Sequence, residues 1–146
     1  LSSAASDVYK RQAFMLGAVG VQLGTRFLVA KECGVHQNYK NKVLKANDIA
    51  TMSTGKRLGH PVRSIKNPYT KEYFKLEYSN ISDEELEAYG RGSLYRAAVE
   101  GDEKTGCFLA GQIAGMVNKE QTAKEIIEEI FTQAEDVLKG ATKWVK

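Results

Sequence analysis

GVQLGTRF, residues 20–27, is the most informative stretch of this 146-residue chain. It lies in an apolar run over 19–27 that has little polar alternation, as expected of a strand covered on both faces in a parallel sheet. Further along, Tyr39, Val43 and Leu44 recur at helical spacing among lysines, which predicts a surface helix. A buried strand followed by a surface helix predicts an α/β fold.

The same stretch ends in a Gly24-Thr25 step that suits a phosphate group. Gly24 has no Cβ, so a ligand can approach the backbone closely, and the amides of both residues can point outward. The Thr25 hydroxyl adds a further donor. A tight turn with a capping threonine is the alternative that these two residues leave open when taken alone.

The middle of the chain mixes glycines and prolines with short β-prone pieces. Residues 48–77 are therefore expected to be loop and short strand. Ser82 and Glu85 have the spacing of a capping box, which predicts a helix to about Tyr89, and a second helix is expected over 93–99.

The last third of the chain contains a small-residue stretch and a long amphipathic pattern. GCFLAGQIAGMV, residues 106–117, predicts a close contact between helices. Asn118 is the expected cap of a terminal helix, with Gln121 at its third position. The apolar residues of this helix recur at spacings of three and four: Ile126, Ile127, Ile130, Phe131, Ala134, Val137, Leu138 and Ala141.

Composition indicates a soluble globular protein, with 42% hydrophobic residues and 27% charged. The 21 basic and 18 acidic residues are interspersed, so no nucleic-acid or membrane partner is implied. Cys33 and Cys107 belong to no CxxC pair and have no histidine at ligand spacing, which predicts neither a disulfide framework nor a metal site and favours a cytoplasmic protein. No apolar run reaches bilayer length and the start lacks a secretory signal.

The first segment, LSSAASDVYKRQ, is foreign in character to the rest of the chain, because it has no apolar period and no capping pattern. The expected division is therefore an artefactual segment over 1–12 and one unit over 13–146. A natural flexible N-terminus is the alternative.

GVQLGTRFLVAKECGVHQNYK, residues 20–40, resembles the strand-eight segment of the FMN-dependent flavoprotein family of nitronate monooxygenases and enoyl-[acyl-carrier-protein] reductases II, also called 2-nitropropane dioxygenase-like. The likeness continues through GHPVRSIKNPYT and covers roughly residues 13–146. It implies the C-terminal part of a TIM (β/α)₈ barrel, with strand eight and its helix, a loop-rich insertion and C-terminal helices. In such barrels a cofactor phosphate often lies at the loops after strands seven and eight.

The resemblance also implies a cofactor and a chemistry. Gln22, Leu23, Gly24 and Thr25 would bind FMN at its phosphate, with NAD(P)H as the electron donor. The substrate would be an enoyl thioester, the branch that the longer middle section favours, or a nitronate. An acyl carrier protein is a candidate partner, and a homo-oligomer is compatible with the family. The isoalloxazine ring would carry the electrons.

The family segments that precede strand eight, including a Gly-Gly turn and a histidine used in proton chemistry, have no counterpart in residues 13–146. We therefore expect the chain alone to be inactive, assign no catalytic residue, and expect an exposed apolar edge that promotes aggregation. A non-catalytic helical interaction module is the alternative function.

Several polar side chains outside the Gly24-Thr25 step have expected roles of their own. His36 is expected to be a surface or capping residue, and His60 a structural one. Arg26 could donate to a phosphate, although a salt bridge to Glu32 or another carboxylate is the preferred expectation. Three lysines are candidates for contact with an acidic carrier protein: Lys40, Lys42 and Lys45.

Overall fold

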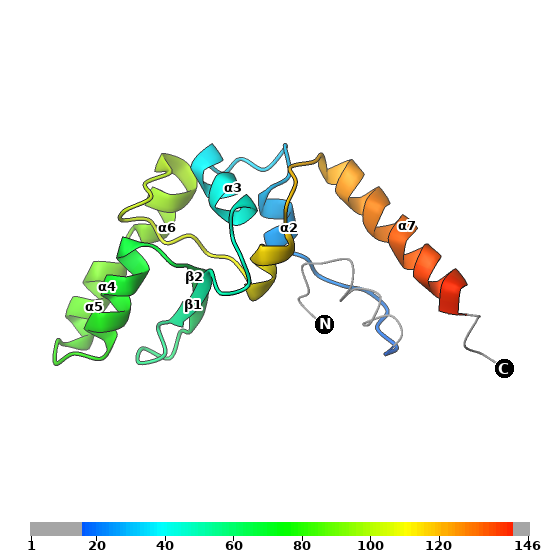
Figure 1. Cartoon of the computed structure of the whole chain (residues 1–146). Helices are drawn as coiled ribbons and strands as arrows, with labels where there is room; N and C mark the ends of the chain where they lie inside the picture. The colour runs from blue at the N-terminus through cyan, green and yellow to red at the C-terminus, as the bar shows by residue number, and fades with distance from the viewer. Residues whose placement is uncertain (1–15, 142–146) are drawn as a thin grey trace.

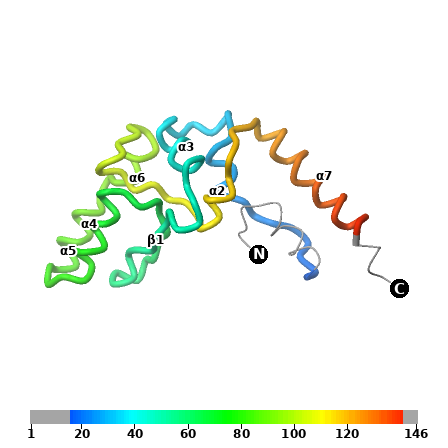
Figure 2. The backbone as a smooth tube through the Cα atoms, viewed as in Figure 1, coloured from blue at the N-terminus to red at the C-terminus, as the bar shows by residue number. Residues whose placement is uncertain are grey.

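The computed structural model describes residues 16–141, which form an arch (Figures 1 and 2). One limb of the arch is helix α7 (Ala123–Ala141), and the other contains a β-hairpin with helices α4 (Pro68–Glu77) and α5 (Asp83–Gly90). Helix α3 (Gln37–Leu44) lies between the limbs, near the top of the arch. Within the described residues, none of the helices combines the length and the apolar character that a bilayer crossing requires.

Helix α3 confirms the predicted surface helix. His36 is its N-cap, and the His36 Nδ1 accepts a hydrogen bond from the Asn38 N–H at 3.1 Å, so the capping role expected of this histidine is confirmed. Tyr39 and Val43 are buried on the inner face of the helix, and Leu44 is partly buried.

The strand predicted over 19–27 is the largest correction. Among the described residues of this run, only Gln22 forms a β-bridge. The end of the run is helical and belongs to the short helix α2 (Thr25–Leu28). Val19 is fully exposed. A strand forms only where a neighbour pairs with its backbone groups, so apolar character and β-propensity are not sufficient to produce one here.

The β-prone pieces of the middle segment form an antiparallel hairpin of β1 (Thr51–Thr54) and β2 (Val62–Ile65). Gly55 has a φ of +80°, and a Cβ at this position would lie 2.5 Å from the carbonyl oxygen of His60. The turn therefore requires glycine at this point. His60 belongs to this turn, as its expected structural role implied.

Helix α4 corrects the prediction that residues 48–77 are loop and short strand throughout. The Asn67 side chain accepts a hydrogen bond from the Thr70 N–H at 2.9 Å, and the Thr70 hydroxyl accepts one from the Asn67 N–H at 2.9 Å. Pro68 occupies the first helical turn, where its missing N–H costs nothing. Asn67-Pro68 is therefore a helix-start signal, and the proline does not mark a loop.

Helix α5 confirms the helix predicted from Ser82. The capping box is formed as expected, since the Ser82 hydroxyl accepts from the Glu85 N–H at 3.2 Å and the Glu85 carboxylate accepts from the Ser82 N–H at 2.9 Å. Helix α5 packs on α4 through aromatic rings, of which Tyr69 and Tyr89 stack with centroids 5.3 Å apart. Leu86 is fully buried beneath them.

The second predicted helix is present as α6 (Ser93–Tyr95), which continues into a π-helical turn, η1 (Arg96–Glu100). Gly101 ends it with a φ of +64°, and a Cβ at this residue would overlap the imidazole of His36. Glycine therefore allows this turn to pack directly against the start of α3.

The contact between helices predicted for 106–117 is wrong in form. The stretch is extended at first and ends in a 3₁₀ turn, η2 (Gln112–Met116). Close backbone approach does occur: a Cβ at Gly115 would lie 2.6 Å from the backbone carbonyl carbon of Asn47. The small residues therefore fit an irregular segment against other backbone.

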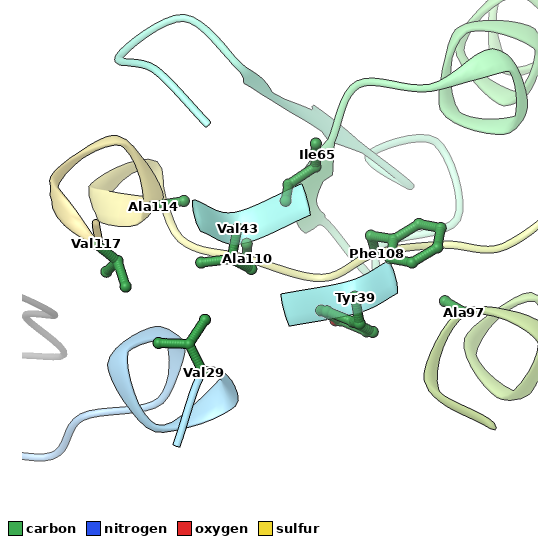
Figure 3. Packing of buried hydrophobic residues seen from close by; sticks show 9 residues of the cluster. All are labelled: Val29, Tyr39, Val43, Ile65, Ala97, Phe108, Ala110, Ala114 and Val117. Atoms are coloured by element: carbon green, nitrogen blue, oxygen red, sulfur yellow. The ribbon is translucent and has the colours of Figure 1, made fainter. Parts of the chain in front are cut away.

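The main core lies around α3, and Figure 3 shows its side chains converging from α3, β2, η1 and the 106–117 stretch. Phe108 is fully buried and meets the Tyr39 ring edge-on with centroids 5.0 Å apart. The buried members of this core are Val29, Tyr39, Val43, Ile65, Ala97, Phe108, Ala110, Ala114 and Val117.

Helix α7 confirms the predicted terminal helix, but its cap is corrected. Thr122, and not Asn118, caps it: the Thr122 hydroxyl accepts from the Glu125 N–H at 3.1 Å, and the Glu125 carboxylate accepts from the Thr122 N–H at 2.7 Å. Ile126 and Ile130 are buried against a small cluster that includes Ala30.

Candidate functional site

Thr25 lines an open groove, and its hydroxyl has one hydrogen available to donate. Its Oγ1 accepts a hydrogen bond from the Gly111 N–H at 2.8 Å. A hydroxyl that accepts one bond can still donate its own hydrogen. Gly111 also permits this approach, because a Cβ at that position would lie 3.3 Å from the Thr25 Oγ1.

The groove has a volume of about 480 Å³ and joins the start of α2 to β2 and the 106–117 stretch. Gly24 is exposed beside it, and a Cβ there would meet nothing within 4 Å. Its walls are mostly apolar, with the Arg63 side chain as the cationic group. The lining residues are Gly24, Thr25, Leu28, Tyr39, Val62, Arg63, Leu109, Ala110 and Gly111.

The back of the groove is closed by Tyr39, whose hydroxyl donates to the Leu109 carbonyl oxygen at 2.6 Å. Burial raises the pKa of Tyr39 far above its usual value, and the nearby Cys107 adds to the effect. The phenol therefore stays neutral. Among the described residues that line the groove there is no carboxylate, histidine or cysteine. The described lining of the groove therefore offers no general base of ordinary pKa.

The four predicted cofactor residues divide into two pairs. Gly24 and Thr25 line the groove, whereas Gln22 and Leu23 are outside its lining. The Leu23 side chain packs toward the cluster that holds Ile126, and the Gln22 side chain is exposed. Of the four predicted residues, only Gly24 and Thr25 are therefore placed to contact a ligand in this groove.

Arg26 is part of the scaffold behind the groove. It is 8% exposed, and its guanidinium donates to the Lys119 carbonyl oxygen at 3.3 Å and to the Gln121 side chain. Glu32, the carboxylate expected to pair with it, accepts instead from the Ala123 N–H at 2.9 Å. These contacts fasten α2 to the segment that leads into α7.

Lys40 is a second scaffold residue, which the sequence does not distinguish from its neighbours in a lysine-rich helix. It is 4% exposed, and its ammonium donates to the Ala30 carbonyl oxygen at 2.7 Å and to Glu120 at 3.1 Å. This hydrogen bond is the main reason that the pKa of the Glu120 carboxyl lies below its usual value. Lys40 is therefore unavailable to an external partner. Lys42 is paired with Glu103 at 2.9 Å, whereas Lys45 is exposed.

The sequence model of the nitronate monooxygenase family matches residues 8–133 of this chain. The chain belongs to this family. The resemblance predicted from GVQLGTRF is confirmed, and with it the membership of a family of oxidoreductases. A probable nitronate monooxygenase of Bacillus subtilis (strain 168) is 26% identical over 120 residues, which are 82% of this chain and 35% of that protein. The chain thus spans about a third of the length of such family members.

Solved structures agree with this assignment. FabK from Thermotoga maritima superposes with a TM-score of 0.92 at 37% identity, over 97% of this chain and 45% of that one. Nitroalkane oxidase from Streptomyces ansochromogenes shares the fold, with a TM-score of 0.75 at 22% identity over 94% of this chain and 39% of that one. The mixture of helices and strands predicted from the sequence is confirmed over the described residues.

Proposed function

We propose that this chain supplies the phosphate-binding part of an FMN-dependent oxidoreductase of the enoyl-[acyl-carrier-protein] reductase II type. The observation that carries the proposal is the likeness to FabK, at 37% identity and a TM-score of 0.92. The curated nitronate monooxygenases match at 24% to 30% identity. The proposal places the chain at the C-terminal end of a TIM barrel, with residues 16–24, of which Leu16 and Val19 are largely exposed, beside the strands of that barrel.

In this proposal Gly24 and Thr25 hold the FMN phosphate. The Thr25 hydroxyl has a hydrogen to donate, and the exposed glycine beside it leaves room for an anion at the backbone. Gln22 and Leu23 contribute through their backbone, since the Leu23 side chain is engaged elsewhere. A bound flavin would supply hydride transfer from NAD(P)H to the double bond of an enoyl thioester, and Gly24 and Thr25 would hold its phosphate end.

The phosphate role is tested by titrating FMN and riboflavin, which differ only in the phosphate, and following flavin fluorescence. Thr25→Val should weaken FMN binding by about tenfold or more, the value of one hydrogen bond to a charged group, and leave riboflavin unchanged. Thr25→Ser keeps the hydroxyl and should restore FMN binding. Equal affinity of the unmodified chain for the two flavins would contradict the role.

We further propose that the chain alone does not turn over. Its groove is open, and its described lining offers no general base of ordinary pKa. Adding FMN and NADH to the purified chain should therefore give no NADH oxidation above that of free FMN. Flavin-dependent oxidation that scales with the concentration of the chain would refute this.

Oxidation of a nitronate is the second candidate function, which the names of the curated relatives favour. A chimera separates the two candidates, with this chain replacing the matching part of Thermotoga maritima FabK. The proposal expects the chimera to reduce an enoyl thioester with NAD(P)H. A chimera that oxidises a nitronate and leaves the thioester unchanged would favour the second candidate.

A further inference from the structure

The extended backbone that reaches Thr25 is held along both of its edges. One edge, over residues 108–111, lies antiparallel to β2. The Phe108 carbonyl oxygen accepts a hydrogen bond from the Ile65 N–H at 2.8 Å. The Ala110 N–H donates to the Arg63 carbonyl oxygen at 3.2 Å. The β-hairpin therefore fixes this edge of the segment.

The opposite edge of the same segment contacts α3 and α2. The Leu109 carbonyl oxygen accepts from the Tyr39 hydroxyl at 2.6 Å. The Gly111 N–H donates to the Thr25 Oγ1 at 2.8 Å. Backbone groups of alternate residues in an extended chain point to opposite edges, so Leu109 and Gly111 share the edge that β2 leaves open. Tyr39 and Thr25 are thus connected through one short piece of backbone.

Tyr39 is a firm anchor for this edge. Its side chain is 5% exposed and its ring meets the Phe108 ring edge-on, so the phenol has little room to move. In Figure 3 the stretch that carries Phe108 and Ala110 passes beside the Tyr39 ring. Burial raises the pKa of Tyr39 far above its usual value, so the hydroxyl keeps the hydrogen that it donates.

We infer that Tyr39 is a positioning residue for the Thr25 hydroxyl. By holding the Leu109 carbonyl oxygen, Tyr39 fixes the direction of the Gly111 N–H two residues later. That N–H occupies one lone pair of the Thr25 oxygen and so turns the hydroxyl hydrogen away from Gly111 and toward the ligand. This role rests on the proposed binding of the FMN phosphate by Thr25.

The first test compares FMN and riboflavin binding, followed by flavin fluorescence. Tyr39→Phe keeps the ring and removes only the hydroxyl. It should weaken FMN binding by about threefold, a part of the loss expected for Thr25→Val, and leave riboflavin binding unchanged. In a chain that already carries Thr25→Val, Tyr39→Phe should cause no further loss of FMN binding, because its effect passes through the Thr25 hydroxyl.

Tyr69→Phe is the matched control. Tyr69 is 6% exposed, lies on α4 outside the groove lining, and its hydroxyl is hydrogen-bonded to Ser93. This variant removes an equally buried hydroxyl and should leave the affinity for both flavins unchanged. If Tyr69→Phe weakened FMN binding as much as Tyr39→Phe, general destabilisation would explain the loss and the positioning role would be overturned.

The Gly111 amide resonance gives a second measurement that needs no flavin. In a ¹⁵N-labelled sample of the chain, Thr25→Val removes the acceptor of this N–H and should shift its resonance. Tyr39→Phe should shift the same resonance in the same direction by a smaller amount. The Ala110 amide, which is bonded to the Arg63 carbonyl oxygen, should move less.

The results separate the positioning role from the proposed phosphate site. An unmoved Gly111 resonance in Tyr39→Phe, unchanged FMN binding, or equal weakening of the two flavins would overturn the positioning role alone. So would a further loss when Tyr39→Phe is added to Thr25→Val. Equal affinity of the unmodified chain for FMN and riboflavin would instead contradict the phosphate site, and the role of Tyr39 with it.

Discussion

The α4–α5 limb and residues 16–24 are built in opposite ways. The limb satisfies its backbone hydrogen bonds with its own side chains. Two capping boxes start its helices. The Glu77 carboxylate accepts hydrogen bonds from the Gly55 and Arg57 N–H groups at 3.1 and 2.9 Å. Residues 16–24 are more apolar, yet Leu16 and Val19 are 88% and 105% exposed.

The difference teaches which kinds of structure short segments can specify by themselves. Caps and turns are made by residues within a few positions of one another, so they can form without support from distant segments. A buried strand is specified by its neighbours as well as by its own side chains. In the described structure, residues 16–24 have the composition of a buried strand without its surroundings.

The largest effect should come from the centre of the limb. Leu86→Ala removes a fully buried side chain from the tyrosine cluster and should lower the free energy of unfolding by about 2–5 kcal/mol. Urea denaturation followed by far-UV circular dichroism measures this. Leu94→Ala, at a residue that is 53% exposed, is the matched control and should cost less than about 1 kcal/mol. Similar losses in the two variants would mean that the limb is not packed as described.

A smaller loss is expected at the start of α4. Asn67→Ala removes a helix cap and also leaves the Glu103 and Gly106 carbonyl oxygens without the donor that reaches them at 3.1 and 2.7 Å. The cost should be about 2–3 kcal/mol. Asn67→Asp keeps the cap but places an oxygen against those carbonyl oxygens, so it should regain little of the lost stability. If Asn67→Asp were as stable as the unmodified chain, the cap alone would account for the loss.

The exposed cap of α5 should matter less. Ser82→Ala should cost about 1 kcal/mol, since it removes one capping hydrogen bond at the surface. Ser82→Asp retains an acceptor and should restore the stability. The same urea titration measures this loss of stability. A loss for Ser82→Ala larger than that for Asn67→Ala would contradict the expected order of the two caps.

Residues 16–24 should show the smallest effect on stability. Val19→Lys should change the free energy of unfolding by less than about 0.5 kcal/mol, because the side chain is fully exposed. It should nevertheless reduce aggregation, since a charge interrupts an exposed apolar run. Light scattering during concentration measures this effect. A large loss of stability would mean that Val19 is covered in solution.

The locally determined parts of the fold are predictable from the sequence. The Ser82 capping box, the cap at His36 and the long terminal helix are all present. Helix α4 also has a local start signal in Asn67-Pro68, but the surrounding glycines and prolines favour a loop interpretation, which is wrong. The absence of the strand over 19–27 cannot be foreseen from its own residues, since its pairing depends on other segments.

The candidate site is predictable only in part for the same reason. Gly24 and Thr25 can be identified from their order and the family resemblance. Their partner Gly111 and the closing residue Tyr39 come from segments distant in sequence. Lys40 shows the same limit, because only its burial distinguishes it from the exposed lysines of its helix.

The role of the Gly24-Thr25 step is the central claim, and amide chemical shifts test it most directly, even where binding is weak. In a ¹⁵N-labelled sample of the chain, FMN should move the amide resonances of Gly24, Thr25 and Gly111, whereas riboflavin at the same concentration should leave them in place. Equal movement with the two flavins, or movement confined to residues away from this groove, would contradict the account.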